Sequence, residues 1–188
     1  MSTFYTEEEL KQLGIAEYGE DVLIGRHAVL YHPERLHIGS HVRIDDFTIV
    51  SGNVRLHDYI HISHFCGLYG AEAGIEMLDF SCLSSKVSVY ATSDDYSGET
   101  MTNPMVPEKY HVRHISAPVQ IGKHGLIGCG SVILPGVTIA EGCSVGSMSL
   151  CNRTTEPFGI YAGIPARRIK ERSRRLEELE AQLRQETM

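Results

Sequence analysis

The chain has 188 residues, 42% of them hydrophobic, with 17 Lys and Arg against 24 Asp and Glu, for a formal net charge of −7 with His neutral. This length suits a single domain over 1–188, and the hydrophobic share is large enough for a core. The acidic balance disfavours non-specific nucleic-acid binding, and no apolar run reaches the ~18–20 residues that span a bilayer.

The N-terminal stretch MSTFYTEEEL is acidic and unlike a secretory signal, so we expect a cytoplasmic protein. Thr6 and Glu9 form a capping-box pattern, Leu10 and Leu13 follow on one face, and Gly14 is a natural stop. A short helix is therefore predicted over 6–13, where it would cap the end of the next element.

From Ile24 to Val145, aliphatic residues recur at intervals of six, which fits neither the helical period of 3.6 nor the strand period of 2. A period of six is typical of a flat-sided coil with three faces per turn, in which every sixth side chain points inward and stacks on its equivalent one turn away. The sequence therefore predicts a parallel β-helix over 22–150. The predicted inward column is Ile24, Leu30, Ile38, Ile44, Val50, Leu56, Ile62, Leu68, Leu78, Ser84, Tyr90, Ile121, Ile127, Ile133, Ile139 and Val145.

Small or modest residues follow four positions after most column members, and they predict a second inward row. Three of the five cysteines, Cys66, Cys82 and Cys143, fall in this row and are interpreted as buried small hydrophobes. Because the cysteines form no CxxC pair and the expected compartment is reducing, we predict neither a disulfide framework nor a metal site.

Glu72 falls on an inward position, where a carboxylate without a partner is costly. Either the backbone turns outward at the glycine-rich segment 70–74, or Glu72 is a site residue. Both alternatives stay open at this stage.

The repeat stops for about thirty residues at 91–118, a polar stretch with three prolines and no periodicity. Long loops within compact repeat domains usually carry function, so this segment is predicted to be an arm that reaches out from the coil. After the repeat, 151–166 is predicted to be irregular. Ile169, Leu176, Leu179 and Leu183 then mark an amphipathic helix over 167–185.

The segments IGKHGLIGCGSVILPGVTIAEGCSVG and YAGIPARRIK resemble the hexapeptide-repeat acyltransferases, nearest to the maltose, galactoside and nucleotide-sugar acetyltransferases. This resemblance covers roughly 20–172. It implies a left-handed β-helix, a homotrimer, and acetyl-coenzyme A as cosubstrate in the cleft between adjacent prisms.

The cosubstrate residues follow in part from this resemblance. Small residues at a turn allow the pantetheine arm to approach the backbone closely. The resemblance places a second group near the adenine end, and the three basic residues within it would bind phosphates, where Arg can act bidentately. The candidates are Gly128, Gly130, Ser131, Gly146 and Ser147 at the turns, and Ala162, Gly163, Pro165, Ala166, Arg167, Arg168 and Lys170 near the C-terminus.

The catalytic base of the maltose and galactoside enzymes is a histidine in a Thr-His-Pro context, and here Asp94 stands at that position. A sugar hydroxyl needs a positioned base, worth about 10²–10⁴-fold, whereas an amine near neutral pH is already a good nucleophile. Asp94 and Asp95 are therefore candidates for binding or orienting an amino-sugar acceptor. Glu72, His61 and His64 are candidate proton acceptors.

The loop and tail also resemble acyltransferases of bacterial surface-polysaccharide pathways, including lipopolysaccharide biosynthesis, some of which use nucleotide-linked 4-amino-4,6-dideoxy sugars. The first hypothesis is therefore an acetyl-CoA-dependent N-acetyltransferase for such a sugar. Two alternatives stay open: a sugar O-acetyltransferase with a histidine base, and a non-catalytic β-helix scaffold. A zinc enzyme of the carbonic-anhydrase type is disfavoured, because the ten histidines show no matching ligand spacing.

Overall fold

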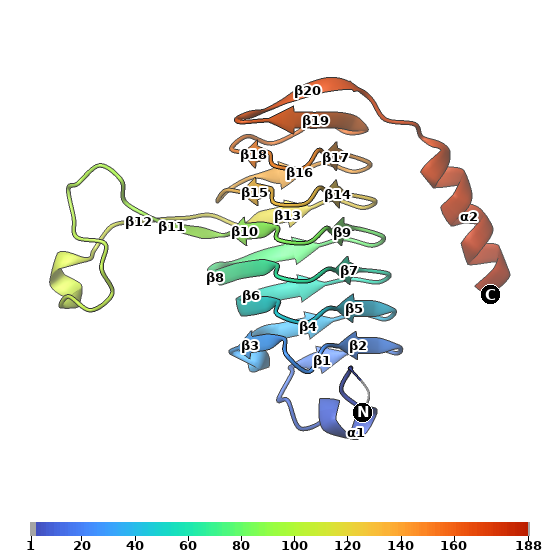
Figure 1. Ribbon diagram of the computed structural model, residues 1–188, viewed down its shortest axis with the longest axis horizontal. Coiled ribbons are helices and arrows are strands. Elements are labelled where there is room, and N and C mark those ends of the chain that lie inside the picture. Colours follow the sequence, from blue (N-terminus) through green and yellow to red (C-terminus); the bar gives the residue numbers. More distant parts are fainter. Residues whose placement is uncertain (1–2, 188) are drawn as a thin grey trace.

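The computed structural model describes residues 3–187 and shows a parallel β-solenoid whose coils stack along one axis (Figure 1). A short helix lies at the N-terminal end, an arm projects from one side, and a longer helix lies beside the solenoid on the other side (Figure 1). The predicted fold class is confirmed: a mainly β chain with a parallel β-helix, a protruding loop and two helices. Within the described residues, no helix is both long enough and apolar enough to cross a bilayer.

The strands are short because each forms only one side of a coil. In chain order the elements are α1 (Glu7–Leu10), β1 (Glu17–Tyr18), β2 (Val22–Ile24), β3 (Val29–Tyr31), η1 (Pro33–Arg35), β4 (Leu36–Ile38), β5 (Val42–Ile44), β6 (Ile49–Leu56), β7 (His61–Ile62), β8 (Gly67–Met77), β9 (Cys82–Leu83), β10 (Ser88–Tyr90), β11 (Thr92–Asp94), η2 (Glu108–Tyr110), β12 (His114–Ser116), β13 (Val119–Ile121), β14 (Leu126–Ile127), β15 (Val132–Ile133), β16 (Thr138–Ile139), β17 (Ser144–Val145), β18 (Leu150–Cys151), β19 (Gly159–Gly163), β20 (Ala166–Glu171) and α2 (Arg175–Thr187).

The solenoid has three faces of parallel strands. Face 1 contains β3, the first part of β6 and β8, and then β10, β15 and β18. Face 2 contains β1, β4, the last part of β6 and β8, β13 and β16. Face 3 contains β2, β5, β7, β9, β14, β17 and β19, and β20 closes it in antiparallel pairing.

The interior is the predicted aliphatic column. Nearly all members before the 70–74 segment and after the arm are at most 3% exposed; Leu30, in an end coil, is half-buried. Most of the second inward row is also buried, and its polar member Thr48 donates a hydrogen bond to the Ser63 carbonyl. Glu72 and Cys82 are the exceptions and lie outside the core. Burial of these aliphatic groups contributes about 25 cal/mol per Å² and is the main source of stability.

The register predicted after 70–74 is wrong by one residue. Met77, Leu83 and Val89 point inward and are at most 1% exposed, whereas Leu78, Ser84 and Tyr90 are half-buried on the outside. The segment 70–74 breaks the pairing register between β6 and β8, and a slip of one residue exchanges the two faces of a strand. For the same reason Cys82 is half-buried on the outside, and Ser81 takes the buried place.

The N-terminal helix begins as predicted. Thr6 Oγ1 accepts from the Glu9 backbone N–H, and Glu9 Oε2 accepts from the Thr6 N–H at 2.7 Å, which completes the capping box. The helix proper is α1, shorter than the predicted 6–13, and Leu10 at its end is 4% exposed.

The C-terminal helix starts later than predicted. Residues 166–171 form β20, which pairs antiparallel with β19 after a turn at Gly163, whose φ is +104°. This pairing satisfies backbone groups that the last parallel strand would otherwise leave unpaired, so sheet formation overrides helix propensity there. As a result Ile169, predicted on the apolar helix face, is 63% exposed on a strand, and Leu179 is 47% exposed on α2.

Candidate active site

The segment 91–118 forms the arm seen in Figure 1, and its base is an antiparallel pair of strands. β11 leaves face 1 directly after β10, and β12 returns to β13, with Asp94 opposite His114 in the register. The two residues that enter and leave the arm are tied together, because Ala117 N–H donates to the Ala91 carbonyl at 3.0 Å. The arm is therefore an ordered extension of the coil.

A cavity of about 550 Å³ lies where the arm meets face 1. One side of it is apolar and aromatic, and the other side is polar and belongs to β11. The lining residues are Tyr69, Tyr90, Val132 and Leu134 from face 1, and Thr92, Ser93, Asp94 and Tyr96 from the arm. A volume of this size is ordinary for a small-molecule site.

Two stacked tyrosines form part of the apolar side. The rings of Tyr69 and Tyr90 have centroids 4.8 Å apart and planes 13° apart. The Tyr69 ring lies directly over Gly67. A Cβ added to residue 67 would be only 2.6 Å from the Tyr69 Cε2, so the ring needs a glycine there. Burial, and secondarily the neighbouring Tyr90, raises the pKa of Tyr69, so its phenol stays neutral and serves as a packing surface.

Asp94 is the carboxylate of the cavity. Its side chain is 56% exposed, and Oδ1 lies 3.5 Å from His111 Nε2. This Nε2 atom is buried and has no hydrogen-bond partner within the described residues 3–187. Sequence reasoning singled out Asp94 by its position but gave no role to His111, because the arm has no periodicity that would place the two together.

Asp95, the second acidic residue predicted for this site, does not line the cavity. Its carboxylate accepts hydrogen bonds from the Ser97 backbone N–H at 2.9 Å and from Ser97 Oγ at 2.8 Å. These bonds lower the pKa of Asp95 and fix it in a local turn. The prediction that Asp95 is an acceptor-binding residue therefore finds no support in the cavity's lining.

Of the two alternatives for Glu72, the structure shows the first: the backbone turns outward at 70–74. Its side chain is 82% exposed and forms a two-pronged ion pair with Arg35, which lowers the pKa of Glu72. It does not line the cavity, so its prediction as a proton acceptor is not supported. The glycines of 70–74 allow this turn: Gly74 has φ +91°.

His61 and His64 come together around Asp45, at the corner between faces 3 and 1. His61 Nε2 donates to Asp45 Oδ2 at 2.9 Å, His64 Nδ1 lies 3.5 Å from the same oxygen, and Arg43 Nε donates to Oδ1 at 2.7 Å. Burial would raise the pKa of Asp45, but the hydrogen bonds from His61 and Arg43 outweigh it and leave the pKa lowered. The side chain of Asp45 is 4% exposed, and the cluster does not line the Asp94 cavity.

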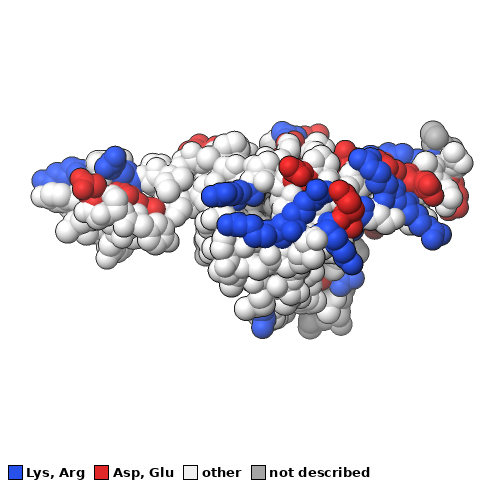
Figure 2. Space-filling model, turned by 90° about the horizontal axis from the view of Figure 1, so that it is seen from above, with Lys and Arg blue, Asp and Glu red and all other residues white. Residues whose placement is uncertain are grey.

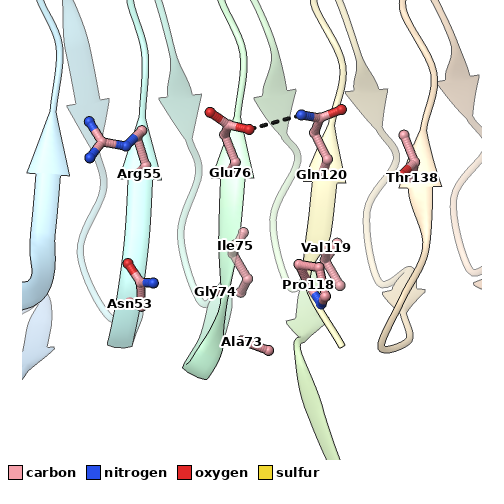
Figure 3. Close-up of a pocket in the computed structure, with 10 residues that line it drawn as sticks. All are labelled: Asn53, Arg55, Ala73, Gly74, Ile75, Glu76, Pro118, Val119, Gln120 and Thr138. Atoms are coloured by element: carbon pink, nitrogen blue, oxygen red, sulfur yellow. Dashed lines mark hydrogen bonds between the residues drawn. The ribbon is translucent and has the colours of Figure 1, made fainter. Parts of the chain in front are cut away.

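A second cavity, of about 430 Å³, lies on face 2 beside the other end of the arm at Pro118 (Figure 3). Figure 3 shows a row of polar side chains on successive strands, Arg55, Glu76, Gln120 and Thr138. Glu76 accepts from Gln120 Nε2 at 2.8 Å and from His57 Nε2 at 2.9 Å, and these bonds lower the pKa of Glu76. This carboxylate is thus held within the row.

The glycines predicted to approach the cosubstrate have a structural reason of their own. A Cβ at Gly128 would fall 2.5 Å from the Ser147 nitrogen of the next coil, and one at Gly146 would fall 3.0 Å from the Ala162 Cβ. Gly130 has φ +71°. Coil stacking therefore requires these glycines whether or not a ligand binds, while Ser147 is exposed at the same corner.

The prediction that Ser131 contacts the cosubstrate is not supported by its position. Its side chain is fully buried, where Oγ donates to the Gly146 carbonyl at 3.0 Å. A hydroxyl held inside the coil cannot contact a ligand in the cleft outside, so the serine belongs to the core.

Basic side chains gather over the end of the solenoid that β20 covers (Figure 2). Arg167, Arg168 and Lys170 are exposed on this strand, and the first two line a small cavity of about 140 Å³ together with Arg153. Arg168 is already bonded to Glu156 at 3.4 Å and Glu171 at 2.6 Å. The predicted turn residues Ala162, Gly163, Pro165 and Ala166 form the β19–β20 connection beside it.

No protein-family model matches the chain. Over 181 residues it is 41% identical to the dTDP-4-amino-4,6-dideoxy-D-glucose acyltransferase of Escherichia coli, covering 95% of this chain and 93% of that protein. AntD, an N-acyltransferase from Bacillus cereus, has the same fold in its solved complex with dTDP and 3-hydroxybutyryl-CoA, with 43% identity, a TM-score of 0.96, and 100% and 99% of the chains covered.

Its D94A mutant in complex with dTDP and coenzyme A is 42% identical over the whole of both chains, with a TM-score of 0.96. The chain described here also has an aspartate at number 94. The resemblance therefore extends over the whole solenoid, the arm and both ends.

Proposed function

The chain belongs to the hexapeptide-repeat acyltransferases and is an acyltransferase, and from this we propose that it N-acetylates the 4-amine of a dTDP-linked 4-amino-4,6-dideoxy sugar with acetyl-CoA as donor. The observation that carries this proposal is the Asp94 carboxylate in the cavity. It stands where the resemblance to the maltose and galactoside enzymes places a histidine. Both relatives described above are named for acyl transfer, one to an amino sugar and the other as an N-acyltransferase.

Each part of the site then has a chemical role. The acceptor amine attacks the thioester carbonyl while Asp94 accepts a hydrogen bond from the amine and orients its lone pair. The carboxylate also takes up the proton that the amine loses as the amide forms. A backbone N–H or serine hydroxyl of the cleft stabilises the oxyanion of the tetrahedral intermediate. Collapse of this intermediate breaks the C–S bond, and the coenzyme A thiolate leaves and takes up the proton held by Asp94, which yields the amide and free coenzyme A.

The coenzyme binds at the other end of the solenoid. Arg167 and Lys170 are exposed, carry positive charge in an otherwise acidic chain, and lie beside the turn that contacts the adenine end in the resemblance. Guanidinium groups bind phosphate oxygens bidentately, which suits the ribose phosphate and the pyrophosphate of coenzyme A. Ser147 and the adjacent corner backbone line the path of the pantetheine arm.

A second candidate function is O-acetylation, and the His61–Asp45 pair favours it. A histidine oriented by a buried carboxylate is the usual form of a general base for a hydroxyl nucleophile. Replacing His61 by Ala separates the two functions. Loss of at least about 10²-fold in kcat/KM would support the histidine base, and near-full activity would support Asp94 alone.

We propose a cytoplasmic homotrimer that serves a surface-polysaccharide pathway such as lipopolysaccharide biosynthesis. Exposed aromatic and aliphatic side chains on face 1 and at its corner support an interface between copies: Val29 is 41% exposed, Tyr31 57%, Phe47 51% and Phe65 56%. Sedimentation equilibrium tests the assembly, with three times the chain mass of 20.9 kDa as the expected result.

The experiment that tests the function follows thiol release from acetyl-CoA with a panel of acceptors. The panel contains dTDP-4-amino-4,6-dideoxyglucose, the matching 4-hydroxy nucleotide sugar, and free maltose and galactosides. Turnover with the amino sugar alone supports N-acetylation. Turnover with the hydroxyl sugars alone would establish the second candidate, and turnover with none would overturn the enzymatic proposal.

A further inference from the structure

The Asp94 cavity has two chemically different sides that meet at the base of the arm. Val132 and Leu134 point outward from face 1 on either side of the buried Ile133, and the β10–β15 pairing places them beside Ser88 and Tyr90. Together with the Tyr69–Tyr90 stack they form a continuous apolar surface. The opposite side carries Thr92, Ser93 and the Asp94 carboxylate.

The proposed acceptor has a matching division. In a 4-amino-4,6-dideoxyhexose, the amine is on C4 and the methyl group is on C5, the adjacent ring carbon, so the two groups are neighbours at one edge of the sugar. When Asp94 holds the amine, the methyl group lies within one van der Waals layer of it. The ring hydroxyls at C2 and C3 are on the other side of the amine.

We propose that Val132 and Leu134, with the edge of Tyr90, form the subsite for the C6 methyl group and make the enzyme selective for 6-deoxy acceptors. This inference rests on the proposed function. The amine on the carboxylate fixes the sugar, and the methyl group is then directed toward the apolar surface. A C6 hydroxyl in the same place would lose its hydrogen bonds to water and gain none from the two aliphatic side chains.

The size of this selectivity follows from the chemistry of apolar pockets. Such a pocket rejects an isostere that adds one hydroxyl by about 10²-fold in kcat/KM. We therefore expect wild-type protein to prefer dTDP-4-amino-4,6-dideoxyglucose over dTDP-4-amino-4-deoxyglucose, which differs only by the C6 hydroxyl, by about this factor.

The test is Val132→Thr, which keeps the shape of the side chain and adds one hydroxyl that can pair with a C6 hydroxyl. The preference for the 6-deoxy acceptor should fall about tenfold in this variant, while KM for acetyl-CoA stays unchanged. Leu134→Asn, a second substitution of similar size, should lower the preference in the same direction. Thermal unfolding of both variants verifies that the solenoid is intact.

The matched control is Val112→Thr, the same substitution at a side chain of the arm that is 62% exposed and does not line the cavity. Its selectivity should equal that of wild type. Wild-type protein that acylates both amino sugars equally well would overturn this inference and leave the proposed function standing. So would a Val132→Thr variant, folded and active, with unchanged preference.

If wild-type protein acylates neither sugar, the proposed function is wrong. Calorimetric titration with the two nucleotide sugars then measures their affinities and tests the subsite separately. A preference for the 6-deoxy compound that is lost in Val132→Thr but kept in Val112→Thr supports the subsite. Equal affinities overturn it.

Discussion

A single carboxylate, Asp94, lines the cavity at the base of the arm, and the proposed acceptor chemistry depends on it. The position could be chosen from the sequence because the resemblance locates the loop entry, and the half-buried His111 beside it could not, because 91–118 has no repeat that places one side chain against another. The same limit applies to Asp95, predicted from its place beside Asp94, and to Glu72, predicted from its inward place in the repeat. Their actual partners, Ser97 and Arg35, depend on turn geometry and on a contact 37 residues away.

Replacing Asp94 by Asn should lower kcat/KM for the amino-sugar acceptor by about 10²-fold or more, because the amide cannot accept the proton and orients the amine less well. KM for acetyl-CoA should stay unchanged, since the proposed phosphate site at Arg167 and Lys170 lies at the other end of the solenoid. Steady-state kinetics with each substrate varied in turn measures both effects. Asp95→Asn is the control and should keep most of the activity. Equal losses in the two variants would contradict the assignment of Asp94.

Among the elements, the coils were the easiest to predict and the ends of the repeat the hardest. A period of six shows which side chains point inward, and it does so from local sequence alone. The predicted inward positions before 70–74 and after the arm are therefore correct. The register after 70–74 and the start of α2 are wrong because both depend on pairing: an insertion in β8 shifts one strand against the next, and β20 exists only because β19 offers a free edge.

Replacing Gly128 by Ala should destabilise the solenoid by about 1–3 kcal/mol, because its Cβ would overlap backbone atoms of the next coil. Thermal or urea unfolding measures the change. Cys129→Ala is the control, since Cys129 is the next residue and its side chain is exposed. A Gly128→Ala protein of normal stability but weakened coenzyme binding would instead assign this glycine to the cleft.

The carboxylate of Glu180 is one of the groups that hold the helix α2 against the solenoid, together with the ion pair between Arg184 and Asp79 at 3.2 Å. Glu180 is 9% exposed and bonds Lys123 Nζ at 2.7 Å, His124 Nε2 at 2.8 Å and Arg184 Nε at 2.7 Å. Burial would raise the pKa of Glu180, but hydrogen bonds from Lys123, Arg184 and His124 outweigh it and lower the pKa from 4.5 to about 2. The stabilisation is therefore complete above pH 4.5 and is lost as the pH falls toward 2.

Replacing Glu180 by Gln should lower the melting temperature at pH 7, and the difference from wild type should shrink as the pH falls from 4.5 toward 2. Differential scanning calorimetry across this range measures it, and the other carboxylates cancel in the comparison. Glu178→Gln, at an exposed position on the same helix, should leave the melting temperature unchanged. A pH-independent difference for Glu180→Gln would contradict the role of its charge.

At the scale of the whole molecule, charge is unevenly distributed. The chain carries a net −7, yet the end covered by β20 presents a group of exposed arginines and lysine (Figure 2). Composition describes only the average surface. It could not locate this basic end, which folding assembles from 153 and 166–171.

Replacing Arg167 by Ala should raise KM for acetyl-CoA about tenfold and leave kcat with saturating donor nearly unchanged, since the contact is made equally in ground and transition states. The effect should disappear with dephospho-acetyl-CoA if Arg167 binds the ribose phosphate. Arg175→Ala, at the start of α2, serves as the control. An unchanged KM in Arg167→Ala would move the phosphate site away from β20.

The stacking of coils also sets a length. On face 3, four strand-to-strand steps separate β9, in the coil that leads into the arm, from β20. At about 4.8 Å per step, the acceptor site and the basic end stand about 19 Å apart along the axis. In the proposed function, the number of coils between them therefore sets the length that the thioester-bearing arm of the donor must span. Excision of one complete coil would preserve stacking and donor binding, yet would carry the reactive carbonyl past the amine and abolish transfer.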